Sequence, residues 1–295
     1  MKNGHTTRQK TPAGRYALLD ELRGLDLVSM ILYHACWDMM FLFGIWMDWY
    51  AGMPGRLWQQ TICWVFILLS GFCAPFGRHM LRRGVTVFAA GALVTAVTLV
   101  FMPEDRVVFG VLTFLGTAML LTGVLEPLLK KVMPTVGLTV SAVLFAVCYP
   151  VGLGWVGLGG WKLMLPQSLY ANYFTAFFGF YPDWFYSADY FGLLPWLFLF
   201  WAGYYLHKAV GRRRMEPLRR PVCPPLGWMG RHSLLLYLLH QPVIYGVLLN
   251  CTPFVRQYGI LFRKWGVFVC RKRKSKRHIV ENSKLKSLKQ CEKKI

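Results

Sequence analysis

Apolar stretches of about twenty residues recur along this chain, and they limit the folds that it can adopt. Each stretch is long enough to cross a hydrocarbon core of about 30 Å as a helix that rises about 1.5 Å per residue. Seven such stretches follow one another, at about 24–46, 58–76, 84–102, 107–129, 134–153, 191–206 and 230–249. The pattern predicts an all-α integral membrane protein with about seven transmembrane helices.

Composition supports this class and divides the chain into three parts. Of the 295 residues, 55% are hydrophobic and 16% are charged, which is unlike a soluble domain. We expect a disordered polar segment at 1–14, a transmembrane domain at 15–250 and a basic tail at 251–295. The tail contains fourteen Lys or Arg and two Glu, so it supplies +12 of the formal charge of +21. Because basic residues interrupt its apolar part, we expect an interfacial helix and a disordered end rather than another span.

Basic residues gather in alternate loops of the predicted transmembrane domain. One side holds the N-terminal segment, the arginines near residue 80, Lys130 with Lys131, and the arginine cluster at 212–220. The opposite side holds only Arg56, Arg106 and Lys162. The positive-inside rule therefore predicts a multi-pass protein of the cell (inner) membrane with a cytoplasmic N-terminus. Topology and contact with membrane lipids explain the basic excess, so no nucleic-acid partner is expected.

One long outer loop, residues 154–190, is dense in aromatic side chains. Two interpretations are open. We favour an aromatic belt at the membrane interface, because Trp and Tyr collect at the level of the lipid headgroups. The alternative is a lid over an outward-facing binding site, since long loops in compact proteins often cover ligands.

The first apolar stretch carries ionisable residues on one helical face. Arg23 and His34 are eleven residues apart, about three helical turns, so both point the same way and His34 lies about 16 Å deeper. Asp26 and Asp38 fall on or beside this stripe. An ionisable group at such depth is costly unless it faces protein or water, so function is the default interpretation. Asp38 could fix the imidazole tautomer; the structural alternative is a histidine that packs against a neighbouring helix.

A second polar stripe lies on the last apolar stretch. Ser233, Tyr237 and His240 recur at positions i, i+4 and i+7 of an otherwise apolar helix. For Ser233 and Tyr237 we favour hydrogen bonding between helices over catalysis. For His240, which lies just before Pro242, a catalytic and a structural role are equally open.

The cysteines do not indicate a metal site. The chain has eight, and none stands in a CxxC or Cys/His spacing typical of zinc ligands. We interpret them as small buried hydrophobic residues, and we expect no metal cofactor.

Several motifs, taken in order, are similar to those of one family. The stretch Leu19-Asp20-Glu-Leu-Arg23-Gly24, followed by His34, resembles the first helix of the heparan-α-glucosaminide N-acetyltransferase catalytic-domain family, in a short bacterial-type form. Its Arg-x10-His spacing also resembles the more distant membrane acyltransferase family 3. Three further segments fit the first family: Val107-Val108-Phe109-Gly110, Asp189-Tyr190-Phe191-Gly-Leu-Leu194-Pro195-Trp196, and Gly230-Arg231-His232-Ser233 with His240-Gln241-Pro242. Gly192 departs from the pattern, which has proline there.

This resemblance implies a membrane-embedded enzyme that transfers an acetyl group from acetyl-CoA to an amino or hydroxyl group of a sugar or glycan at the outer face. His34 would be the base or the nucleophile, assisted by Asp38 and His240. The phosphates of cytosolic CoA need cations at the inner face, for which Arg23, Arg78, Arg82 and Arg83 are candidates. For all of these but Arg23, plain topology is the stronger explanation residue by residue.

Two rival functions fit the same features. Intramembrane His and Asp residues would suit a proton-coupled transporter or flippase, although no paired inverted repeat is visible. A catalytically inactive membrane scaffold is the other rival. The sequence leaves open the acceptor, N- or O-acetylation, direct transfer or an acyl-histidine, and the oligomeric state.

Overall fold

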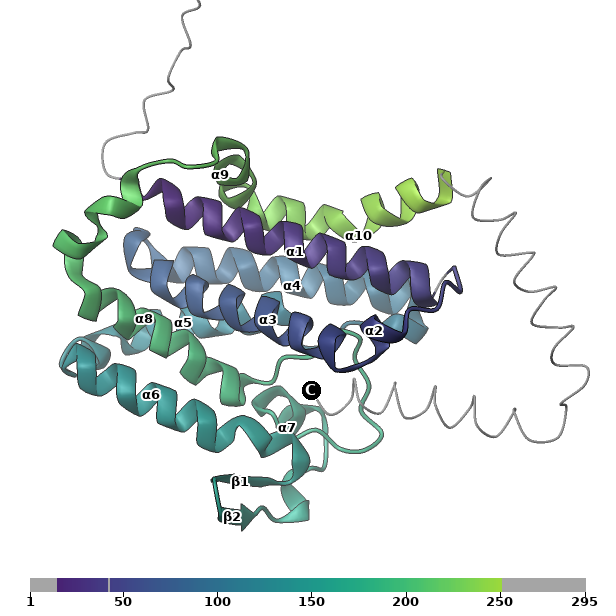
Figure 1. Ribbon diagram of the computed structural model, residues 1–295. Helices are drawn as coiled ribbons and strands as arrows, with labels where there is room; N and C mark the ends of the chain where they lie inside the picture. Colours follow the sequence, from purple (N-terminus) through teal and green to yellow (C-terminus); the bar gives the residue numbers. More distant parts are fainter. Residues whose placement is uncertain (1–14, 42, 251–295) are drawn as a thin grey trace, which may run out of the picture.

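The computed structural model of the chain describes residues 15–41 and 43–250 (Figure 1). The predictions made for 1–14 and 251–295 lie outside the described residues. Seven long helices form the body: α1 (Ala17–Phe41), α3 (Met53–Cys73), α4 (Met80–Phe101), α5 (Val111–Leu129), α6 (Pro134–Cys148), α8 (Leu193–Met215) and α10 (Ser233–Asn250).

Shorter elements connect the long helices. They comprise α2 (Asp48–Ala51), α7 (Tyr173–Phe178), α9 (Pro224–Arg231) and the 3-10 turns η1 (Ala74–Phe76), η2 (Pro103–Asp105), η3 (Tyr149–Leu153), η4 (Gln167–Leu169) and η5 (Glu216–Arg219). Two antiparallel strands, β1 (Trp155–Leu158) and β2 (Trp161–Met164), pair from Trp155 with Met164 to Leu158 with Trp161.

Five segments of the described chain are long and apolar enough to cross a membrane. They are Met53–Phe76, Met80–Phe101, Val111–Leu129, Pro134–Leu153 and Ser233–Asn250. The predicted all-α membrane class is therefore confirmed. The count of seven stays a prediction, because it also requires α1 and α8, which carry more charged residues.

The main hydrophobic core forms where α5 and α8 meet their neighbours. Phe114 of α5 and Phe200 of α8 are almost completely buried there. Glycines let the backbones approach closely: a Cβ at Gly71 of α3 would collide with the Phe200 carbonyl oxygen. Inside this core, the Trp201 indole Nε1 donates a hydrogen bond of 2.9 Å to the Thr122 hydroxyl. By contrast, α4 and α10 turn long apolar faces outward, as expected for contact with lipid.

The segment 154–190, which we expected to be a long loop, contains regular structure. It folds into the hairpin of β1 and β2, the turn η4 and the helix α7. Glycines form the turns between these elements: Gly154, Gly159 and Gly179 all have positive φ, which glycine adopts without steric cost. The many aromatic residues around them hid this turn signal in the sequence. Asn172 caps α7 by accepting a hydrogen bond of 3.0 Å from the Thr175 amide. Neither the belt nor the lid interpretation is tested by this structure.

The first and last long helices differ from their predicted bounds, and the differences matter for the site. α1 begins at Ala17 rather than at Gly24, so Asp20 and Glu21 lie within its first turns. The last expected helix is interrupted: α9 ends at Arg231 and α10 begins at Ser233. α9 packs on the first half of α1, and α10 lies beside the second half (Figure 1).

Candidate active site between α1 and α10

His34 of α1 faces α10. Its Nδ1 lies 3.3 Å from the side-chain nitrogen Nε2 of Gln241, and its ring centroid lies 4.9 Å from that of His240. When the Gln241 amide donates this bond, Nδ1 is the acceptor and the neutral imidazole carries its proton on Nε2. The structure thus brings together His34 and His240, two predicted site residues from opposite ends of the chain.

His240 is held in one tautomer by its own helix. The side chain is buried, with 9% exposed, and its Nδ1 bonds to the backbone carbonyl oxygen of Tyr237. A carbonyl oxygen only accepts, so Nδ1 carries the hydrogen and the neutral ring has its lone pair on Nε2. That Nε2 is buried and has no hydrogen-bond partner among the described residues. A buried lone pair of this kind is suited to taking a proton from a bound substrate.

Among the described residues, no hydrogen bond joins Asp38 to His34. Asp38 is 2% exposed, and its Oδ2 has no hydrogen-bond partner among residues 15–41 and 43–250. The polar group that contacts His34 is Gln241, one residue after His240. Sequence reasoning missed Gln241 as a site residue, although it was visible in the His240-Gln241-Pro242 motif. The role predicted for Asp38 stays a prediction.

A second group missed from the sequence is Asp189, in the connection between α7 and α8. Its Oδ2 accepts a hydrogen bond of 3.0 Å from the Val111 amide, at the start of α5, and one of 3.2 Å from the Tyr237 hydroxyl. Burial raises the pKa of the Asp189 carboxyl, and these two hydrogen bonds oppose the rise. The Tyr237 ring, whose hydroxyl donates this bond, lies 5.3 Å from the His240 ring, so Asp189 helps to position the turn of α10 that carries His240.

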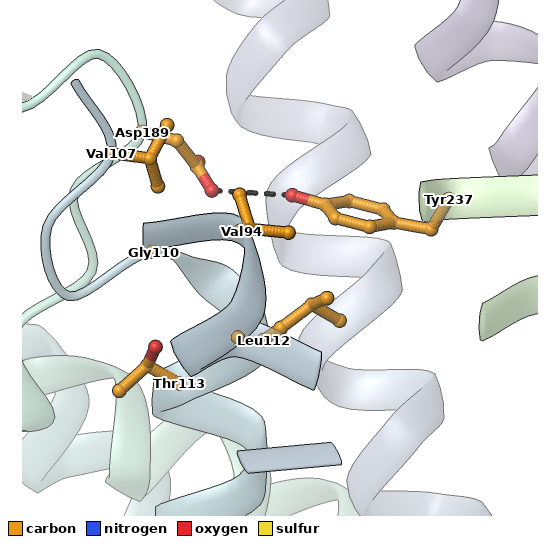
Figure 2. Close-up of a pocket in the computed structure, with 8 residues that line it drawn as sticks. Val94, Val107, Gly110, Leu112, Thr113, Asp189 and Tyr237 are labelled. Atoms are coloured by element: carbon orange, nitrogen blue, oxygen red, sulfur yellow. Dashed lines mark hydrogen bonds between the residues drawn. The ribbon is translucent and has the colours of Figure 1, made fainter. Parts of the chain in front are cut away.

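A small pocket opens beside Asp189 (Figure 2). Its lining residues come from α4, from the connection before α5, from the start of α5, from the connection before α8 and from α10: Gly91, Val94, Val107, Gly110, Leu112, Thr113, Asp189 and Tyr237. Figure 2 shows the Asp189 carboxylate and the Tyr237 hydroxyl meeting at its edge. Tyr237 thus lines this pocket while its ring lies 5.3 Å from that of His240.

The four arginines predicted to bind the donor fall into two groups. Arg23 of α1 and Arg83 of α4 are half-buried and close enough to interact electrostatically, whereas Arg78 and Arg82 are exposed. Arg83 donates a hydrogen bond of 3.4 Å to the Ala74 carbonyl. Neither Arg23 nor Arg83 forms an ion pair with a carboxylate in the described part of the chain.

Two acidic residues that precede Arg23 in the sequence are engaged elsewhere. Asp20 pairs with Arg15 at 2.6 Å, and Glu21 accepts hydrogen bonds of 2.9 and 3.1 Å from the Val222 amide. Two like charges left together without a carboxylate favour an anionic ligand. Because α1 runs without interruption from Ala17 to Phe41, Arg23 keeps its place about three turns before His34.

Comparison with known proteins decides the family. The family model described as heparan-alpha-glucosaminide N-acetyltransferase, catalytic, matches residues 15–242. The chain belongs to this family. The matched region contains His34, Asp189 and His240, and it confirms the resemblance seen in the sequence motifs. No curated protein and no solved structure matches the chain significantly.

Membership of this family makes the protein a membrane acetyltransferase in general terms. The family uses acetyl-CoA in general. Within the described residues, no group of three or more His, Cys, Asp or Glu side chains is placed to hold a metal ion.

Proposed function

We propose that the protein transfers the acetyl group of cytosolic acetyl-CoA to an amino or hydroxyl group of a sugar or glycan at the outer face of the cell membrane. One observation carries this proposal: two histidines from separate long helices, α1 and α10, lie with ring centroids 4.9 Å apart inside the region that matches the acetyltransferase family. Ionisable groups are rarely placed within membrane helices without a function.

Acetyl transfer requires proton movements that a histidine pair can make. The acceptor nitrogen or oxygen attacks the thioester carbonyl and loses a proton to a base, the carbon–sulfur bond breaks, and the CoA thiolate takes up a proton. His34 is the base in this proposal. It takes the acceptor's proton at Nδ1, whose lone pair the Gln241 amide holds in the free protein, and its Nε2–H gives a proton to the CoA thiolate. The unpartnered Nε2 of His240 supplies a second site for the same proton.

The donor would enter from the end of the helix bundle where α1 begins. Arg23 and Arg83 provide two half-buried cations for the CoA phosphates, and the exposed Arg78 and Arg82 extend the positive surface. The distance of about 16 Å along α1 between Arg23 and His34 is within the reach of an extended pantetheine arm. A cytoplasmic N-terminus, as the positive-inside rule predicts, would put this entrance on the side where acetyl-CoA is found.

The test is a transfer assay with purified protein. Detergent-solubilised wild-type protein is mixed with acetyl-CoA and methyl glucosaminide, and both CoA release and the acetylated sugar are measured. The proposal expects the two products to appear in equal amounts. A protein that moves labelled acetyl-CoA or sugar into proteoliposomes without acetylating it would be a transporter, and one that does neither would be a scaffold. Either result overturns the proposal.

A further inference from the structure

The hairpin of β1 and β2 has two faces of different chemistry. Directly paired residues share a face, which on one side brings together four apolar side chains: Val156, Leu158, Trp161 and Leu163. Three of them are more than half exposed, and the exposed fraction of Trp161 is 59%. The other side carries Lys162, whose Nζ lies 4.8 Å from the centroid of the Trp155 ring. The hairpin is therefore amphipathic, and the described part of the chain leaves its apolar face largely uncovered.

The hairpin is attached to the end of a segment that is long and apolar enough to cross a membrane. This segment, Pro134–Leu153, leads through Gly154 directly into β1. The Leu165 amide donates a hydrogen bond of 2.9 Å to the Gly154 carbonyl, and the Tyr170 hydroxyl donates one to the Val151 carbonyl, so the base of the hairpin is held to the end of the segment. Figure 1 shows the hairpin beside the C-terminal end of α6, projecting away from the other long helices. The exposed apolar surface of α6 thus continues into the hairpin.

Neither bulk water nor the hydrocarbon core of a bilayer suits this hairpin. Within the described residues its two strands pair only with each other, so the outer edge of each strand keeps unpaired backbone N–H and C=O groups. Such groups are costly in hydrocarbon, whereas the apolar face is costly in water. The boundary between lipid headgroups and acyl chains satisfies both requirements, because water and headgroups reach the backbone there while apolar side chains enter the acyl layer.

The residues of the hairpin match the chemistry of that boundary. Tryptophan collects at headgroup level, and the hairpin carries Trp155 and Trp161. Lys162 is the only charged residue within 151–182, so no carboxylate of this segment competes with lipid phosphate for its ammonium group. We infer that the hairpin docks on the phospholipid membrane at the end of α6, with its apolar face toward the acyl chains and Lys162 toward the headgroup phosphates. This inference applies the aromatic-belt interpretation to one defined element, and it does not depend on the proposed function.

Quenching of Trp161 fluorescence at different membrane depths tests the inference. Full-length protein is placed, one copy per disc, in nanodiscs of phosphatidylcholine that is unbrominated, brominated near the headgroup or brominated near the chain ends. Subtracting the emission of Trp161→Phe from that of wild type isolates the Trp161 signal. This signal should be quenched most by the bromines near the headgroup and only weakly by acrylamide in the water. Quenching by acrylamide alone would show that the apolar face lies in water, and protection from both quenchers would show that protein covers it; either result overturns the inference.

Two matched variants test whether the apolar face is what holds the hairpin to the lipid. Leu158→Asp places a charge on that face, directly opposite Trp161, and should reduce quenching of the Trp161 signal by the bromines near the headgroup. Lys162→Gln changes only the other face and should keep the wild-type quenching in this zwitterionic lipid. Both positions are exposed, so both variants should fold with a Tm close to that of wild type. Wild-type quenching in Leu158→Asp would overturn the inference, because the apolar face would then not determine where the hairpin lies.

Discussion

The close approach of α1 and α9 can be tested at Gly24, which follows Arg23 in the motif at the start of the chain. An ideal Cβ at Gly24 would lie 2.7 Å from the carbonyl carbon of Leu226 in α9, and closer still to its oxygen. These are backbone atoms, so a rotamer change cannot relieve the contact. Gly24→Ala must therefore push the two helices apart.

The expected size of the effect follows from overpacking. Inserting a methyl group into a tightly packed contact costs about 1–3 kcal/mol, which the gain in helix propensity of about 1 kcal/mol for Gly to Ala offsets only in part. Gly246→Ala in α10 is the matched control, because no atom lies within 4 Å of the Cβ it would add. There the propensity gain acts alone, so the control should be neutral or stabilising.

Thermal unfolding in detergent, followed by tryptophan fluorescence, compares the two variants. For a chain of this size, about 1 kcal/mol corresponds to a change of roughly 2–4 °C in Tm. Gly24→Ala should melt several degrees below Gly246→Ala and should also weaken acetyl-CoA binding, since α1 carries Arg23. If both alanine variants are equally stable, the packing of α9 on α1 described above is wrong.

Three further predictions concern the polar groups. Arg23→Ala should raise the KM for acetyl-CoA more than it lowers kcat, as measured by donor titration. An unchanged affinity for acetyl-CoA would show that the role of Arg23 is structural. Gln241→Ala should lower kcat about three- to tenfold, which corresponds to the loss of one neutral hydrogen bond. Asp38→Asn should lower kcat less. If Asp38→Asn lowers kcat more in the same assay, Asp38 rather than Gln241 is the partner of His34. Burial raises the pKa of Asp189 above its usual 3.8, so the folded protein binds this proton more tightly than the unfolded chain does. Wild-type protein therefore loses stability as pH rises from about 4 and Asp189 ionises. The Tm of Asp189→Asn relative to wild type should increase between pH 4 and pH 7. A constant difference in Tm across that range would show that the carboxylate is well solvated.

The sequence predicted those parts of the fold that depend on local pattern. Apolar length marked the five spanning segments, and helical periodicity placed Arg23 and His34 on one face of α1. The hairpin at Trp155–Met164 and the helix α7 were not predicted, because the glycine turns that form them lie among many aromatic residues. Their signal was present in Gly159, Gly160 and Asn172, but the density of aromatic residues outweighed it.

The contacts within the candidate site could be predicted only in part, because contacts between distant segments leave no trace in one sequence. The pairing of His34 with His240 depends on how α1 and α10 pack, and only the positions of the two residues within apolar stretches hinted at it. Gln241 and Asp189 were visible in motifs but gave no periodic signal of their own. Asp189 lies in a connection rather than on a helix, so no face could be assigned to it before the structure placed it against Val111 and Tyr237.

The most direct test of the account is the acetyl-transfer rate of His34→Ala, measured in the purified-protein assay beside His232→Ala. His232 is an exposed histidine at the junction of α9 and α10 whose ring packs on Trp228, so its loss controls for removing an imidazole from this region. His34→Ala should lose about 10²–10⁴-fold in kcat while it keeps its Tm and its place in the membrane. His232→Ala should transfer acetyl groups at close to the wild-type rate. Wild-type turnover by His34→Ala would contradict the proposed mechanism.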